Sequence, residues 1–184
     1  MVGAALAAAH GPIDWFWLLV TVLGVFCIEF AKNASGEIFD WDSGADRALR
    51  PEDHSPFSGG KKVLVDALLT RTDVWTVAGL FYALAGLSAI AGDVFREPRA
   101  LILGLIGIAI AYFYHAPPLK FAYRGLGELA VAVVYGPLLC AGTFLVQRNE
   151  LPIAAFLVAL PIGLLVGAFL LINEFPDRIA DGPV

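Results

Sequence analysis

Residues 13–32 of the chain are IDWFWLLVTVLGVFCIEFAK, and residues 36–46, GEIFDWDSGAD, follow almost at once. A helix of about 20 mostly apolar residues is long enough to cross the hydrocarbon core of a bilayer. The second stretch adds four carboxylates directly behind this helix: Glu37, Asp40, Asp42 and Asp46. A carboxylate beside hydrocarbon is costly unless it is paired or faces water. The order of the two stretches therefore predicts a membrane span that ends in a polar site.

The composition also indicates a membrane protein. Of the 184 residues, 59% are hydrophobic and 16% are charged, and the mean hydropathy is +0.76. Soluble domains are nearer to about 45–50% apolar. The net charge of −5 argues against nucleic-acid binding. The two cysteines, Cys27 and Cys140, lie inside apolar stretches and lack metal-site spacing, so we expect buried hydrophobic positions.

Apolar stretches of membrane-spanning length recur along the chain. They lie at 13–32, 74–92, 99–116, 127–147 and 152–173. Residues 2–9 are apolar but too short to span, and they resemble the end of a helix whose beginning is absent. The predicted fold class is all-α: a polytopic transmembrane helix bundle with about five full spans and a partial N-terminal one.

The basic residues predict how the bundle lies in the membrane. If the spans alternate, nine fall on one side: Lys32, Arg47, Arg50, Lys61, Lys62, Arg71, Lys120, Arg124 and Arg178. The other side has three: Arg96, Arg99 and Arg148. The positive-inside rule places the nine-residue side in the cytoplasm. Both acidic clusters of the chain fall on that side, so an integral protein of the plasma or inner membrane with a cytoplasmic polar site is expected.

The first acidic cluster continues a polar stripe on its helix. At 100° per residue, Glu29, Asn33, Glu37 and Asp40 fall within about 80° of one another, and we expect the helix to end near Ser43-Gly44. Carboxylate oxygens suit Mg²⁺, which usually takes one or two carboxylates together with phosphate and water. A solvated helix end without a specific role is the simpler alternative.

The second cluster is in residues 173–181, NEFPDRIAD, where Glu174, Asp177 and Asp181 share a helical face and Pro176 predicts a helix start or a kink. Two carboxylate clusters facing each other could hold two metal ions and clamp a diphosphate. Donors to the diphosphate are available in the basic residues that follow Gly59-Gly60 and in those of the 114–128 loop. For Arg47, Arg50 and Arg71 we expect ordinary cytoplasmic charge without a role in the site. His10, His54 and His115 are not spaced as a metal site, and we expect them in loops or interfaces.

These motifs resemble the UbiA-type intramembrane prenyltransferases, all-helical membrane enzymes that join an isoprenoid diphosphate to an acceptor. The family's first motif is NDxxD followed by another Asp. Asp40 and Asp46 match the second and third aspartates of this motif. Glu37 occupies the position of its first Asp, and Gly36 occupies the position of its Asn. The side-chain amide of the motif is absent here, and Asn33, one turn earlier, is its substitute. Residues 173–181 resemble the second motif.

The resemblance implies the site. The catalytic aspartates would be Asp40, Asp46, Asp177 and Asp181, and Mg²⁺ would be held by these four with Glu37 and Glu174. The run 114–128, YHAPPLKFAYRGLGE, resembles the family's basic loop. The expected substrate-binding residues are Asn33, Lys61, Lys62, Tyr114, Lys120, Tyr123 and Arg124. For Tyr114, a place in the interfacial aromatic belt is an equal alternative.

The resemblance also ranks the substrates. Residues 55–69, SPFSGGKKVLVDALL, resemble a stretch of the quinone branch, notably the naphthoate prenyltransferases of menaquinone synthesis. The expected partners are an isoprenoid diphosphate, an aromatic acceptor and the lipid bilayer. By comparison with the family, residues 1–184 form one incomplete prenyltransferase domain that is clipped at both ends and lacks its C-terminal spans. The alternative is a non-catalytic membrane protein: a degenerate relative, an ion pathway or an assembly subunit.

Overall fold

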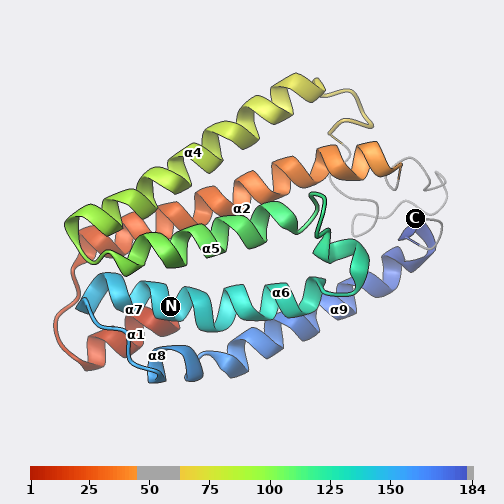
Figure 1. The fold of residues 1–184 in the computed structure, drawn as a ribbon. Helices are drawn as coiled ribbons and strands as arrows, with labels where there is room; N and C mark the ends of the chain where they lie inside the picture. The colour runs from red at the N-terminus through yellow and green to blue at the C-terminus, as the bar shows by residue number, and fades with distance from the viewer. Residues whose placement is uncertain (45–62, 182–184) are drawn as a thin grey trace.

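A computed structural model describes residues 1–44 and 63–181, and for residues 173–181 it describes the backbone alone. Within these ranges the secondary structure is entirely helical (Figure 1). In chain order the helices are α1 (Val2–Ala9), α2 (Trp15–Ser43), α4 (Arg71–Phe95), α5 (Arg99–Phe113), the 3-10 turn η2 (Phe121–Arg124), α6 (Gly127–Val133), the π-helical turn η3 (Val134–Leu138), α7 (Leu139–Arg148), α8 (Ala154–Leu157) and α9 (Leu160–Asp181).

The predicted all-helical membrane bundle is confirmed. In the described part of the chain, four helical segments are long and apolar enough to cross a bilayer: Trp15–Ser43, Arg71–Phe95, Gly127–Arg148 and Ala154–Ile172. The remaining predicted span, 99–116, is α5, which has 15 residues and ends at Phe113. At 1.5 Å per residue it is about 22 Å long, less than the hydrocarbon thickness of about 30 Å. The last helix continues through Pro176 and does not begin there.

Helix α2 is the longest element and positions much of the site. The carboxylate of Asp14 accepts a hydrogen bond from the Trp17 backbone N–H at 3.2 Å and caps the first turn. The last turn ends at Gly44, which adopts a left-handed conformation with φ of 86°. The predicted end at Ser43-Gly44 is therefore confirmed, and the 29 residues extend for about 43 Å.

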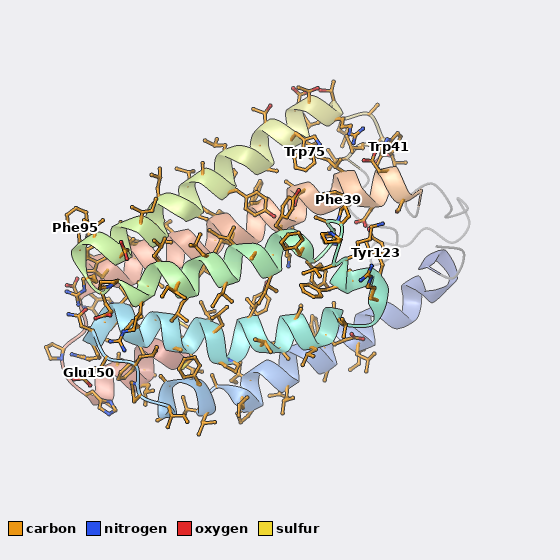
Figure 2. All side chains as sticks on the ribbon, viewed as in Figure 1. Phe39, Trp41, Trp75, Phe95, Tyr123 and Glu150 are labelled. Carbon is orange, nitrogen blue, oxygen red and sulfur yellow. The ribbon has the colours of Figure 1, made fainter. Side chains whose placement is uncertain are left out.

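The helices run along one long axis, so each contributes to one or both ends of the bundle (Figure 1). α2 packs along α4 and α4 along α5, while α6 packs on α9 and α1 on α7. Near the C-terminal end of α2, Phe39 of α2 meets Trp75 of α4 edge to face, with 5.8 Å between ring centroids (Figure 2). This contact fixes the end of α2 beside the start of α4.

Small residues let the helices approach closely. An added Cβ at Gly24 of α2 would lie 2.9 Å from Ser88 Cβ of α4, and one at Gly104 of α5 would lie 2.7 Å from Ala89 Cβ. The tightest crossing is between α6 and α9, where a Cβ at Gly163 would lie 2.2 Å from the Ala132 carbonyl oxygen. Such crossings are the usual means by which helices associate in lipid, where burial of apolar surface supplies little drive.

At the end of the bundle where α2 begins, arginine side chains bond to backbone carbonyls of neighbouring segments. The Arg148 guanidinium at the end of α7 donates to the carbonyls of Ala7, Gly11 and Pro12, and so ties α1 and its connection to α7. Arg96 donates to the Val146 carbonyl at 2.8 Å. These contacts satisfy backbone acceptors at helix ends, which otherwise lack partners, and fix the bundle at this end.

We predict that Gly163→Ala destabilises the bundle, because its methyl group would collide with the Ala132 carbonyl. Overpacking of this kind costs about 1–3 kcal/mol. The matched control is Gly86→Ala on α4, where an added Cβ meets nothing within 4 Å, so that the change should be neutral or stabilising by up to about 1 kcal/mol. Unfolding of both variants in detergent is the measurement. Equal stability of the two would contradict the packing described for α6 and α9.

Candidate functional site

One end of the bundle gathers the elements on which the predicted site residues lie. The C-terminal turns of α2 and α9, the connection between α5 and α6, and the segment that leads into α4 all lie at this end (Figure 1). The backbones of Asp40 and Asp177 are therefore on the same side of the bundle. This arrangement is the one that two cooperating acidic motifs require.

The predicted polar stripe on α2 is helical along its whole length. Glu29, Asn33, Glu37 and Asp40 all lie within α2, and their side chains follow one face toward the site end. Burial differs along this face. Glu37 is 5% exposed, whereas Asp40 is partly exposed. The stripe therefore runs from the interior of the bundle to its surface.

Asp40 and Tyr123 are brought together by the fold. The Tyr123 hydroxyl, in η2, donates a hydrogen bond to Asp40 Oδ1 on α2, and Tyr123 lies at the site end of the bundle (Figure 2). The two residues are 83 positions apart in the sequence. The contact joins the first acidic motif to the basic loop, which the sequence predicted as two separate parts of one site.

Glu37 has a structural partner. Its Oε1 accepts a hydrogen bond of 2.9 Å from the backbone N–H of Leu64, in the segment before α4. Leu64 in turn packs with Ile38 and Val74 in a small buried cluster. The carboxylate thus fixes the entry to α4 against α2. Its assignment as a metal ligand stays a prediction.

The neighbouring carboxylate Asp42 points elsewhere. Its Oδ2 lies 2.5 Å from Arg71 Nη2 in an ion pair whose two side chains are 40% and 57% exposed. This pair links the end of α2 to the start of α4 on the outside of the bundle. Asp42 is therefore set apart from Asp40 although only one residue separates them.

The departure from the family pattern at Gly36 has a steric counterpart. A Cβ at this position would lie 2.7 Å from Cε1 of the His115 ring. His115 also stacks edge-on with Tyr114 and Tyr123, with ring centroids 4.8 and 6.3 Å away. The predicted loop histidine therefore packs into the space that a side chain at position 36 would fill, immediately beside the Asp40 contact.

The predicted basic loop lies at the same end. Lys120 adopts a left-handed conformation with φ of 46°, and its Nζ lies 5.6 Å from the centre of the Tyr123 ring. Arg124 ends η2 and is exposed. Tyr114 lies under Lys32 Nζ, 5.5 Å from the centre of its ring, so it faces α2 within the bundle.

Several predicted residues fall partly or wholly outside the described structure. Asp46, Lys61 and Lys62 lie outside the described residues. Glu174, Asp177 and Asp181 lie on α9, whose side chains are described only up to residue 172. Among the described side chains, no group of three or more His, Cys, Asp or Glu residues forms a metal cluster.

A second polar cluster, which the sequence pattern did not predict, lies deeper in the bundle. Glu29 Oε1 lies 2.8 Å from Lys32 Nζ and accepts from Asn33 Nδ2 at 3.2 Å, while the Tyr135 hydroxyl donates to Glu29 Oε2. Lys32, which the positive-inside count placed with the cytoplasmic basic residues, is turned inward with a side chain 15% exposed. The i, i+3 spacing of an acid and a base inside an apolar span was the available signal.

An apolar chamber extends from this cluster toward the opposite end of the bundle. It lies between α2, α4, α5 and the α6–α7 segment, with about 910 Å³ free of protein atoms, open space at its mouth included. Its lining on α2 extends from Thr21 to Glu29, about 12 Å along the helix axis. Glu29 and Tyr135 form the end of the chamber that is nearer to Asp40.

A model of the UbiA prenyltransferase family matches residues 1–182. The 1,4-dihydroxy-2-naphthoate octaprenyltransferase of Bacillus subtilis is 27% identical over 177 residues, which are 96% of this chain and 55% of the relative. The 2-carboxy-1,4-naphthoquinone phytyltransferase of Synechocystis is 31% identical over 156 residues, 81% of this chain and 46% of the relative. The human UbiA prenyltransferase domain-containing protein 1 is 26% identical over 183 residues, 98% of this chain and 52% of the relative.

The chain thus spans about half the length of the curated relatives that it matches. No solved structure matches it significantly.

We predict that Glu37→Ala loosens the segment at residues 63–69, because it leaves the buried Leu64 N–H without an acceptor at a cost of about 1–3 kcal/mol. Glu37→Gln keeps an acceptor oxygen and removes the charge. Limited proteolysis should cut Glu37→Ala faster within 63–69 and cut Glu37→Gln at the wild-type rate. Should both variants be cut at the wild-type rate while Glu37→Gln loses divalent-cation binding, Glu37 would be a metal ligand and not a clamp on this segment.

Proposed function

The chain belongs to the UbiA prenyltransferase family, and we propose that it acts in the membrane to transfer a prenyl chain from an isoprenoid diphosphate to an aromatic acceptor. Two of its relatives are named for a naphthoate or a naphthoquinone acceptor. A fused two-ring acceptor of the menaquinone type is therefore the proposed substrate class. The proposal applies to the whole protein, of which these residues correspond to about half the length of the relatives.

The observation that carries the proposal is the contact between Asp40 and Tyr123. It joins the first acidic motif to the basic loop, at the end of a bundle that also contains an apolar chamber. A prenyl diphosphate has the same division, with a charged head and a hydrocarbon tail. A site with carboxylates and cations next to an apolar space suits such a molecule.

Members of the family are generally metal-dependent, and Mg²⁺ is the proposed ion. The donor chemistry fits, because carboxylate oxygens are its preferred protein ligands and Asp40 is partly exposed at the site end. The residues that would hold it are Asp40, Asp46, Asp177 and Asp181, with Glu37 and Glu174. When bound, the ion would neutralise negative charge on the departing diphosphate.

Transfer breaks the allylic C–O bond to the diphosphate, forms a C–C bond to the ring and releases a ring proton. Lys120 and Arg124, with Lys61 and Lys62, would donate hydrogen bonds to the diphosphate oxygens as their charge grows. Tyr123 would hold the Asp40 carboxylate in one orientation. The apolar chamber would exclude water, which otherwise captures an allylic cation.

The site end of the bundle is proposed to face the cytoplasm. Nine of the twelve Lys and Arg residues are assigned to that side by the positive-inside count. Soluble diphosphates and divalent cations would reach the site from this side. An ion-pathway role, the alternative, is less well supported, because Asp40 lies about 37 Å along α2, beyond a hydrocarbon core of about 30 Å.

We predict that Asp40→Asn lowers Mg²⁺-dependent transfer of a labelled prenyl chain in membranes by about 100-fold or more. Tyr123→Phe should lower it about 10- to 100-fold, since it removes one hydrogen bond to a charged group, worth about 1.5–3 kcal/mol. The matched control is Asp42→Asn, two residues along the same helix, whose carboxylate pairs with Arg71 on the outer face.

Asp42→Asn should change transfer by no more than about twofold, because the exposed ion pair lies on the outer face and contributes about 1 kcal/mol or less to stability, not to the reaction. Equal losses in Asp40→Asn and Asp42→Asn would mean that the end of α2 acts only through its stability. Transfer unchanged in Asp40→Asn would exclude the proposed site.

A further inference from the structure

The cluster at the end of the apolar chamber nearer to Asp40 contains an acid, a base, an amide and one tyrosine hydroxyl. Glu29 is bound on one oxygen by Lys32 and Asn33 and on the other by Tyr135. Lys32 Nζ also lies 5.5 Å from the ring centre of Tyr114 and 5.9 Å from that of Tyr135. The proposed transfer assigns no role to Glu29, Lys32 or Tyr135.

The cluster lies at a depth where charge is costly. Glu29 is 14 residues beyond Trp15, the first residue of α2, so it lies about 21 Å along an axis that crosses a hydrocarbon core of about 30 Å. Ionisable residues at such depth are rare and usually serve a binding or transport role. Here the acid and the base neutralise each other, and the carboxylate is still 39% exposed.

Glu29 and Tyr135 are the polar side chains that an occupant of the chamber can use. The other hydroxyl groups in the chamber lining donate to carbonyls of their own helices: Thr21 to Trp17, Ser88 to Leu84 and Thr143 to Leu139. A carboxylate has about four acceptor positions, and three of those of Glu29 are used. One acceptor position therefore remains at the wall of the chamber.

The backbone at Tyr135 is also unusual. Residues Val134–Leu138 form a π-helical turn that contains Pro137, whose missing N–H interrupts the α-helical pattern. Single π-turns occur often at functional sites, because they redirect side chains. The turn is the part of the α6–α7 segment that supplies Tyr135 to Glu29.

We propose that Glu29, Lys32 and Tyr135 form the subsite that binds the hydroxylated ring of the aromatic acceptor. A ring O–H donates to the remaining acceptor position of Glu29, and the Tyr135 hydroxyl oxygen, which donates its own proton to Glu29, is a second acceptor beside it. The ring itself lies in the adjoining apolar space. This assignment of the acceptor rests on the proposed function, while the binding of a ring hydroxyl does not.

Charge disfavours a diphosphate at this position more strongly than an acceptor ring that carries a single carboxylate. The Glu29–Lys32 pair has no net charge, and the group that faces the chamber is a carboxylate. A diphosphate at the same place would meet like charge in a medium of low dielectric. The diphosphate is therefore assigned to the outer site at Asp40 and the basic loop, and the ring to the inner cluster.

The test compares 1-naphthol with naphthalene, which differ by one hydroxyl group, for binding to the full chain in detergent. In the wild type, 1-naphthol should bind about tenfold more tightly, as expected for a hydrogen bond to a charged group. Glu29→Gln and Tyr135→Phe should each reduce this preference about fivefold and leave naphthalene affinity unchanged. Thr143→Val, which removes a hydroxyl in the same chamber, should leave the preference intact.

An unchanged preference in both Glu29→Gln and Tyr135→Phe would overturn the inference. If Glu29→Gln also loses naphthalene binding, its fold is perturbed, and the preference measured in Tyr135→Phe then tests the inference.

A parallel titration with inorganic pyrophosphate and Mg²⁺ tests the proposed function separately. Pyrophosphate binding that is lost in Asp40→Asn but kept in Glu29→Gln supports two subsites, whereas equal loss in both variants overturns the division between them. If the wild type binds no pyrophosphate, the proposed function fails. The preference for 1-naphthol over naphthalene is measured without pyrophosphate, so it still tests the ring-hydroxyl subsite.

Discussion

Helix α2 is longer than the hydrocarbon core of a bilayer is thick, and the candidate site depends on this excess. Its 29 residues extend for about 43 Å, against about 30 Å of hydrocarbon. The first part supplies a wall of the apolar chamber, and the last three turns emerge with Glu37 and Asp40 on the same face. Because the helix is continuous, the position of α2 along the bundle axis determines both the depth of Glu29 and the exposure of Asp40.

The chamber exists because small residues bring the helix axes close without filling the space between them. Gly24 and Gly104 both lie at close helix contacts and both line the chamber. Large side chains at these positions would separate the helices or occupy the chamber. The bundle thereby keeps close van der Waals contact at its crossings, which supports helix association in lipid, and leaves apolar space beside the polar site.

The sequence allowed the helices, and the position of the ends of α2 and α9 at one end of the bundle, to be predicted, because these follow from the hydrophobic runs and their alternation. Hydrophobic runs located the spans, Gly44 located the end of α2, and 100° spacing placed Glu29 and Asp40 on one face. The partners of these carboxylates could not be predicted in the same way. Leu64 lies 27 positions from Glu37, and Tyr135 lies 106 positions from Glu29. Contacts of this kind depend on how the helices pack, which a residue pattern does not specify.

Gly36 illustrates how a departure from a family motif can follow from packing. Read as sequence, glycine in place of the motif's asparagine is the loss of one amide. In the structure, the absent side chain leaves room for the His115 ring, which stacks on Tyr123, and Tyr123 holds Asp40. The change at position 36 is thereby coupled to the orientation of the motif's own aspartate through a loop almost 80 positions away. Restoring the asparagine alone would force His115 to move, so the motif and the basic loop are constrained as a pair.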